Sequence, residues 1–177
     1  MNENKISIQK YAMHFGTYMG IFWIIKFLLV PLAMTNLFFA FLFLGLTFTV
    51  PFLAYYLTKS FRAKICGGYI SFIQAWVFLG FMFIFASILA ALGHYIYFRY
   101  LDHGYIISSI IQALDELPKE IPDTQLAIDQ MKRNIELMST MTPIKITMQQ
   151  LSKNVLNTAL LSLIISLFVA KKKNTIQ

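Results

Sequence analysis

Charged residues are scarce in this sequence. They make up 13% of its 177 residues, whereas hydrophobic residues make up 58%. The charged share is about half that of an average soluble domain. A chain with so few polar side chains cannot cover a compact soluble surface with them. The composition therefore excludes an ordinary soluble domain and predicts an integral membrane protein.

Cysteine and acidic residues are also few. Cys66 is the one cysteine, so an intramolecular disulfide is excluded. Of the eight acidic residues, seven lie between residues 99 and 153. The net charge of +7 would favour a nucleic-acid partner if it formed one patch, but the basic residues stand in short segments that flank apolar runs. We expect no nucleic-acid partner and interpret these charges as a signal of membrane topology.

Long apolar runs dominate what is present. A hydrocarbon core of ~30 Å needs ~20 helical residues, and the first three runs supply that number. The fourth apolar run, Val155 to Ala170, is short for a span, but the lysines that follow it can extend to the interface and its helical spacing continues upstream. We expect transmembrane helices at residues 11–34, 37–57, 70–98 and 153–170. The last helix should begin outside the membrane at Pro143, with Thr142 as its N-cap.

Residues 99–152 form the one sizeable polar region and carry two amphipathic patterns. Asp123 is expected to cap the second of the two helices. We therefore predict a single all-α membrane domain over 1–177. It is a four-helix bundle with an extracytoplasmic helical hairpin between the third and fourth transmembrane helices.

Two local expectations concern the second run. Pro51 lies inside it and should kink the helix, and a neighbouring helix or the hydroxyls of Thr47 and Thr49 should satisfy the freed carbonyl. Beyond this run, residues 58–70 should form a basic loop that ends in a Gly-Gly turn.

The basic residues predict the orientation. Lys5 and Lys10 precede the first run, three basic residues lie in 58–70, and three lysines follow the last run. Cytoplasmic segments carry the excess of Lys and Arg in membrane proteins. Both termini and the 58–70 loop are therefore expected in the cytoplasm, and the 99–152 insert outside.

The loop contains a stretch that identifies a family. Gly67-Gly68-Tyr69-Ile70-Ser71-Phe72, followed by Gln74-Ala75, resembles the most distinctive stretch of an uncharacterised Bacteroidota membrane protein family, domain of unknown function 4199. The run from Tyr95 to Asp102 resembles the family's exit from its third helix. Here Ile73 replaces a glycine, and His103 stands where the family usually has proline. The resemblance implies four spans with a polar insert and a location in the bacterial inner membrane, but no activity.

Lys26 is the one charged residue within the first three runs. A lysine at the bilayer centre costs about 2.5–3.5 kcal/mol on insertion scales. Two interpretations stay open. Lys26 contacts a substrate or ion, or it extends to the outer interface or pairs with Asp102. His94 and His103 complete the candidate functional set, since they lie with Asp102 near the outer boundary, whereas His14 lies near the inner one.

Other residues are candidates for contacts. The loop that carries the family resemblance is a candidate partner-contact surface, although Ser71 can equally be the N-cap of the third helix. Its residues are Gly67, Gly68, Tyr69, Ser71 and Gln74.

Small residues at every fourth position predict close helix packing, within the bundle or between copies. They are Gly16, Gly20, Thr158, Ser162 and Ser166. We expect Asn157 to add an interhelical hydrogen bond, and Trp23 and Trp76 to lie near the membrane boundaries.

Three functions remain open. The sequence has no nucleophile elbow, phosphate loop, paired catalytic carboxylates or zinc motif, so we predict no catalytic residue, metal or cofactor. The favoured hypothesis is a non-enzymatic scaffold or accessory subunit whose partners are the lipid bilayer and other membrane proteins, or a second copy. The alternatives are a small transporter or channel component that uses Lys26, and an enzyme that acts on a lipid or lipid-linked substrate through His94, Asp102 and His103.

Overall fold

The computed structural model describes residues 8–117 and 122–171. Helices joined by turns make up the described chain, apart from one isolated backbone bridge between Ile70 and Lys171, so the all-α prediction is confirmed. Its elements are α1 (Ile8–Ala33), α2 (Leu37–Lys64), α3 (Phe72–Tyr100), α4 (Tyr105–Asp115), α5 (Pro122–Ser139) and α6 (Pro143–Val169).

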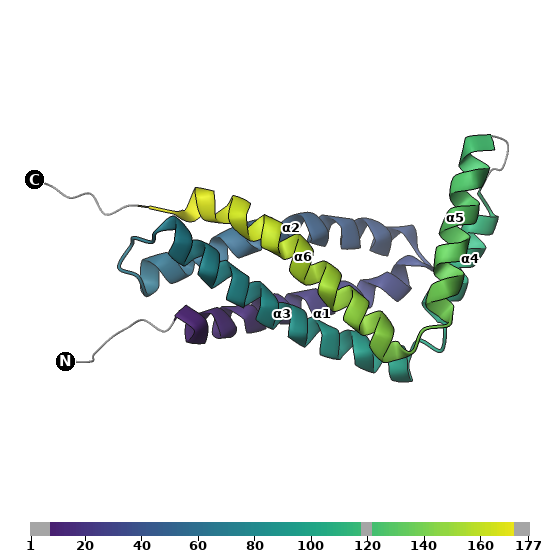
Figure 1. Ribbon diagram of the computed structural model, residues 1–177, viewed down its shortest axis with the longest axis horizontal. Coiled ribbons are helices and arrows are strands. Elements are labelled where there is room, and N and C mark those ends of the chain that lie inside the picture. Colours follow the sequence, from purple (N-terminus) through teal and green to yellow (C-terminus); the bar gives the residue numbers. More distant parts are fainter. Residues whose placement is uncertain (1–7, 118–121, 172–177) are drawn as a thin grey trace, which may run out of the picture.

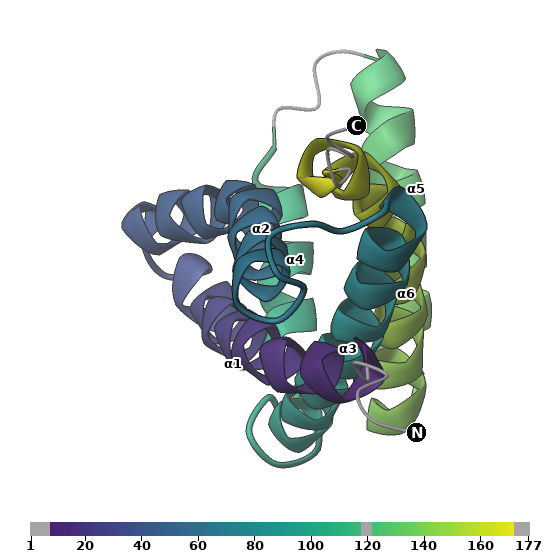
Figure 2. The ribbon, with the colours of Figure 1, turned by 90° about the vertical axis from the view of Figure 1, so that its left-hand side faces the viewer.

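Four of these helices are long and apolar enough to cross a membrane, namely α1, α2, α3 and α6. This finding indicates a multi-pass membrane protein. In Figure 1 the four helices run side by side, with α3 packed between α1 and α6. Figure 2 shows α2 at the edge of this group, where it packs mainly on α1 and leaves most of its surface exposed.

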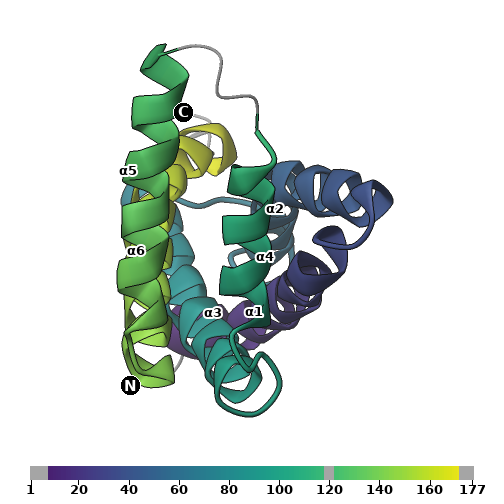
Figure 3. The same cartoon turned by 90° about the vertical axis from the view of Figure 1, so that its right-hand side faces the viewer.

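The two shorter helices α4 and α5 lie between α3 and α6 in the sequence. They contact each other, and the Lys132 ammonium pairs with the Asp115 carboxylate across them. Figure 3 shows both helices lying across one end of the bundle. The α1–α2 turn is at this end, whereas the α2–α3 loop and the end of α6 are at the opposite end (Figure 1).

Small side chains bring α1 and α3 close together. A Cβ built on Gly16 would lie 2.7 Å from the Met82 carbonyl oxygen, and one built on Gly20 would lie 2.9 Å from Leu89 Cβ. On α6 the hydroxyls of Thr158, Ser162 and Ser166 are buried and donate to carbonyls of their own helix, at 2.7–2.8 Å. Their hydrogen-bonding groups are thus satisfied within α6, which leaves a narrow helix face free to pack.

The second long helix differs from the sequence expectation in two ways. It continues to Lys64, so most of the expected 58–70 loop is helical. The reason is that 58–64 contains no glycine or proline, and Arg62 donates to the Val169 carbonyl oxygen at 2.6 Å. In addition, the Thr47 and Thr49 hydroxyls donate to the carbonyls of Phe43 and Gly45. Neither hydroxyl therefore reaches the Thr47 carbonyl, which is the one that Pro51 leaves without its helical donor.

Two helix starts were predicted at proline or beside it. The helix α6 does begin at Pro143 with Thr142 at the N-cap position, although the Thr142 hydroxyl makes no capping bond. The helix α5 begins at Pro122, which places Asp123 inside the helix, so the predicted N-cap was wrong. Proline is favoured in the first turn because it has no N–H to leave unpaired and its φ is already helical.

Candidate binding cavity between the long helices

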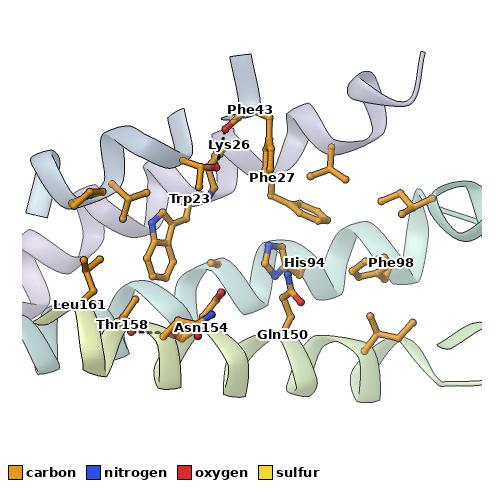
Figure 4. A pocket seen from close by; sticks show the side chains of 18 of the residues that line it. Trp23, Lys26, Phe27, Phe43, His94, Phe98, Gln150, Asn154, Thr158 and Leu161 are labelled. Carbon is orange, nitrogen blue, oxygen red and sulfur yellow. Dashed lines mark hydrogen bonds between the residues drawn. The ribbon is translucent and has the colours of Figure 1, made fainter. Parts of the chain in front are cut away.

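A cavity of about 460 Å³ lies among α1, α2, α3 and α6, at the end of the bundle nearer to α4 and α5. Ile106 of α4 and Met138 of α5 line it as well. Its volume falls within the range of small-molecule pockets, about 300–1,000 Å³. Figure 4 shows side chains from α1 and α3 pointing into the same space as side chains from α6.

Lys26 lies in this cavity. Its side chain is half-buried, and its Nζ stands 5.3 Å from the centre of the Phe43 ring. No described residue forms an ion pair with it, and none of the described residues that line the cavity is acidic. Lys26 thus has a weak cation–π contact in place of a counter-ion.

Of the alternatives left open for Lys26, pairing with Asp102 does not occur in the described structure. Asp102 is buried, and its carboxylate accepts hydrogen bonds from the backbone N–H groups of Gly104 and Ile106, each at 3.1 Å. The carboxylate therefore satisfies the first free donors of α4 and holds the turn that leads into that helix. A carboxylate engaged in this way is not part of the cavity.

His94 belongs to the cavity and is 5% exposed. Its ring centre lies 4.1 Å from that of Phe27, and in Figure 4 the ring lies between Phe27 of α1 and Gln150 of α6. The buried Nδ1 atom has no hydrogen-bond partner within the described structure. A buried polar atom without a partner costs about 1–3 kcal/mol, so this nitrogen requires an explanation.

Trp23 is a second member with an unpaired buried nitrogen. Sequence reasoning placed it near a membrane boundary, but it is 7% exposed, lines the cavity and stacks on Phe83 with ring centres 6.0 Å apart. Its indole Nε1, which can only donate, finds no acceptor in the described part of the chain. Trp23 and Lys26 stand three positions apart on α1, so both lie on one face of that helix.

The helix α6 contributes a polar wall that sequence reasoning missed. The amide side chains of Gln150, Asn154 and Asn157 line the cavity, and the structure gives none of them a hydrogen bond among the described residues. The interhelical bond expected of Asn157 is therefore absent there. The sequence does hold one indication of this wall. Polar residues stand at positions 150, 154, 157 and 158, a spacing that puts them on one face of a helix.

The residues proposed for an enzyme do not converge. His94 lies in the cavity, and Asp102 caps α4. His103 is exposed at a turn with φ of 44°, and its Nδ1 lies 3.1 Å from the Leu101 carbonyl oxygen. His14, which was not in that set, lies near the other end of α1, where its ring contacts Tyr18. Within the described structure, His94, Asp102 and His103 therefore do not form a shared site.

The Gly-Gly loop has its own structural roles. Gly67 and Gly68 adopt positive φ of 65° and 91°, which side-chain-bearing residues rarely do. Ser71 and Gln74 form a reciprocal capping box at the start of α3. Tyr69 is left 40% exposed. Burial raises the pKa of the adjacent Cys66 thiol, which favours the unreactive protonated form.

The backbone of this loop is tied to the end of α6. Ile70 and Lys171 exchange two backbone hydrogen bonds of 3.1 and 2.9 Å, beside the bond from Arg62 to Val169. The end of the bundle opposite the cavity is thus cross-linked between elements that are far apart in the sequence.

Comparison with curated proteins and with solved structures gave no match. A family model does match, described as a protein of unknown function (DUF4199), and the match covers residues 14–171. The chain therefore belongs to this uncharacterised family, domain of unknown function 4199.

Proposed function

We propose that this protein binds a small molecule in the cavity between its membrane-spanning helices, as a small transporter or channel component. The observation that carries this proposal is the Lys26 ammonium group, which has no counter-ion among the described residues. It lies in a cavity where buried nitrogens of Trp23 and His94 also lack partners among those residues. Ionisable residues within spanning segments are costly, and where they line a cavity they mark substrate or ion pathways.

The packing of the bundle supports a route of entry. The cavity is near α4 and α5, and the loosely packed α2 forms one of its walls. The opposite end is held by the bonds from Arg62 and Ile70 to the end of α6. We therefore place the opening at the α4–α5 end. The excess of basic residues at the other end supports an extracytoplasmic opening, and we propose that both termini lie in the cytoplasm of a bacterial inner membrane.

Cysteine accessibility tests whether water and solutes reach the cavity. In a Cys66→Ala background, Asn154→Cys places a thiol in the cavity, and Leu160→Cys places one on the outer face of the same helix, where Leu160 is 63% exposed. In a membrane, that outer face meets lipid. A small water-soluble methanethiosulfonate should modify Asn154→Cys at least about tenfold faster, because thiolates form only where water reaches. Equal and slow modification of both variants would refute an open cavity.

The scaffold hypothesis keeps one supporting observation. The helix α5 lies outside the long helices and leaves Leu126, Met131 and Leu137 between 55% and 60% exposed. Such residues on a polar helix are candidates for contact with a partner protein. Purification in mild detergent of the wild type and of a Leu126→Glu, Leu137→Glu variant would test it. A partner or second copy that remains bound equally to both would count against a role for this face.

A further inference from the structure

We propose that the ligand of the cavity is a carboxylate attached to an apolar body, with the carboxylate held by Lys26 and the indole N–H of Trp23. This inference rests on the proposed function, since it names the chemical class that the cavity would take. It is carried by the charge of the lining, by the unpaired donors and by the division between polar and apolar walls.

The charge of the lining selects a single negative charge. The described lining contains one ammonium group and no carboxylate. Inside a low-dielectric bundle an uncompensated charge is expensive, and a ligand with one negative charge removes that cost. A dianion would bring a second uncompensated charge, and a cation would add to the first. A neutral ligand would leave Lys26 as it is.

The unpaired donors suit the two oxygens of a carboxylate. The Lys26 ammonium offers several N–H donors, and the Trp23 indole offers one that has no acceptor among the described residues. Both project from the same face of α1 because they stand three positions apart. An ionised carboxylate accepts at both oxygens and forms shorter, stronger hydrogen bonds with such donors than a neutral group does. The amides of Asn154 and Asn157 face this space from α6 and add further donors.

The remaining walls call for an apolar body. Phe27, Phe98 and Ile106 line the part of the cavity toward α4, and Phe27 and Ile106 belong to one buried apolar cluster. A cavity of about 460 Å³ holds a small ligand and is too small for a whole two-chain phospholipid. The ligand is therefore a single-chain fatty acid from the bilayer or an aromatic carboxylate from water, which share the chemistry that the cavity recognises.

Fluorescence of Trp23 provides the test. In a Trp76→Phe variant, Trp23 is the sole tryptophan. The full chain is placed in nanodiscs of phosphatidylcholine, so that no anionic lipid competes. Laurate represents the bilayer source, and naphthoate the aqueous one. Dodecanol and naphthalenemethanol are the matched neutral controls. We expect saturable changes in Trp23 emission with laurate or naphthoate, and none with the matched alcohols. The carboxylate that binds identifies the source.

Two lysine variants complete the experiment. Lys26→Met should weaken carboxylate binding about tenfold or more, which corresponds to about 1.4 kcal/mol. Lys59→Met, which changes an exposed lysine on α2, should leave it unchanged. Equal binding of the alcohols by the wild type, or equal carboxylate binding by Lys26→Met, would overturn the inference. So would the absence of binding by either carboxylate. The accessibility of Asn154→Cys is measured separately. If that thiol is accessible but neither carboxylate binds, this inference is overturned while the proposed open cavity stands.

Discussion

The polar residues of the cavity are placed at a cost to stability. Lys26 is half-buried without a counter-ion, and buried nitrogens of His94 and Trp23 lack partners within the described structure. Groups that serve the fold alone are normally hydrogen-bonded. In this chain, Asp102 shows that normal case, because its buried carboxylate accepts two backbone bonds. We infer from this contrast that Lys26, Trp23 and His94 serve the proposed ligand site, whereas Asp102 serves the fold.

Replacing Lys26 should therefore make the protein more stable. Lys26→Met removes a charge that costs about 2.5–3.5 kcal/mol near the centre of a span, and we expect the midpoint of thermal unfolding in detergent to rise. A circular dichroism melt measures it, with Lys59→Met as the control that should not shift. If Lys26→Met instead lowers the midpoint, Lys26 is a structural residue and the assignment to ligand binding fails.

Replacing Asp102 should have the opposite effect. Asp102→Ala leaves the N–H groups of Gly104 and Ile106 without their acceptor, at a cost of about 1–2 kcal/mol. Hydrogen exchange of α4 should speed up, while Asp129→Ala, on the exposed surface of α5, should leave it unchanged. Unaltered exchange in α4 after Asp102→Ala would mean that this carboxylate does not hold the turn.

At the scale of single residues, sequence reasoning found part of the cavity. Lys26 and His94 stand out because ionisable groups are rare within apolar runs. The sequence did not single out Trp23, Gln150 and Asn154, because an amide or indole side chain does not indicate which neighbouring helix it faces. Their common position follows from the packing of α1 and α6 around α3, which only the tertiary structure supplies.

At the scale of elements, α1 and α3 are in close contact at Gly16, so a larger residue at this position would clash with α3. Gly16→Ala would place a methyl group 2.7 Å from the Met82 carbonyl oxygen, a backbone atom that cannot move aside cheaply. We expect a clear drop in the thermal midpoint, on the order of the 1–3 kcal/mol typical of overpacking.

A matched glycine gives the control for this prediction. Gly45, inside α2, has open space where a Cβ would be, so Gly45→Ala should raise helix stability by about 0.5–1 kcal/mol. The two variants introduce the same methyl group and are expected to act in opposite directions. A similar midpoint for both would show that α1 and α3 are not packed as closely as described.

Helix boundaries show where local sequence suffices. The start of α6 at Pro143 and the start of α3 after Ser71 follow from local chemistry, namely a proline in the first turn and a capping box. The end of α2 cannot be predicted from local sequence. Its last turns lie beyond the apolar run and are supported by the bond from Arg62 to Val169, a residue distant in the sequence. A basic segment was therefore mistaken for a loop.

At the scale of the whole molecule, the apolar runs predicted the four long apolar helices of the described structure, but they gave no indication of the cavity. The proposed orientation can be tested directly. In the Cys66→Ala background, Leu126→Cys lies on α5 and Tyr69→Cys lies in the Gly-Gly loop, and both positions are exposed. A membrane-impermeant maleimide should label Leu126→Cys in intact spheroplasts. It should label Tyr69→Cys only after the spheroplasts have been permeabilised. The reverse pattern would invert the topology.

The most direct test of the account combines the cavity with its ligand. The measurement is the rate at which a water-soluble methanethiosulfonate modifies Asn154→Cys, in the Cys66→Ala background, with and without the carboxylate that binds. Ligand in the cavity should slow modification severalfold, and the additional change Lys26→Met should abolish this protection. A rate that the carboxylate leaves unchanged, or that it slows equally without Lys26, would contradict a ligand-binding cavity built around that lysine.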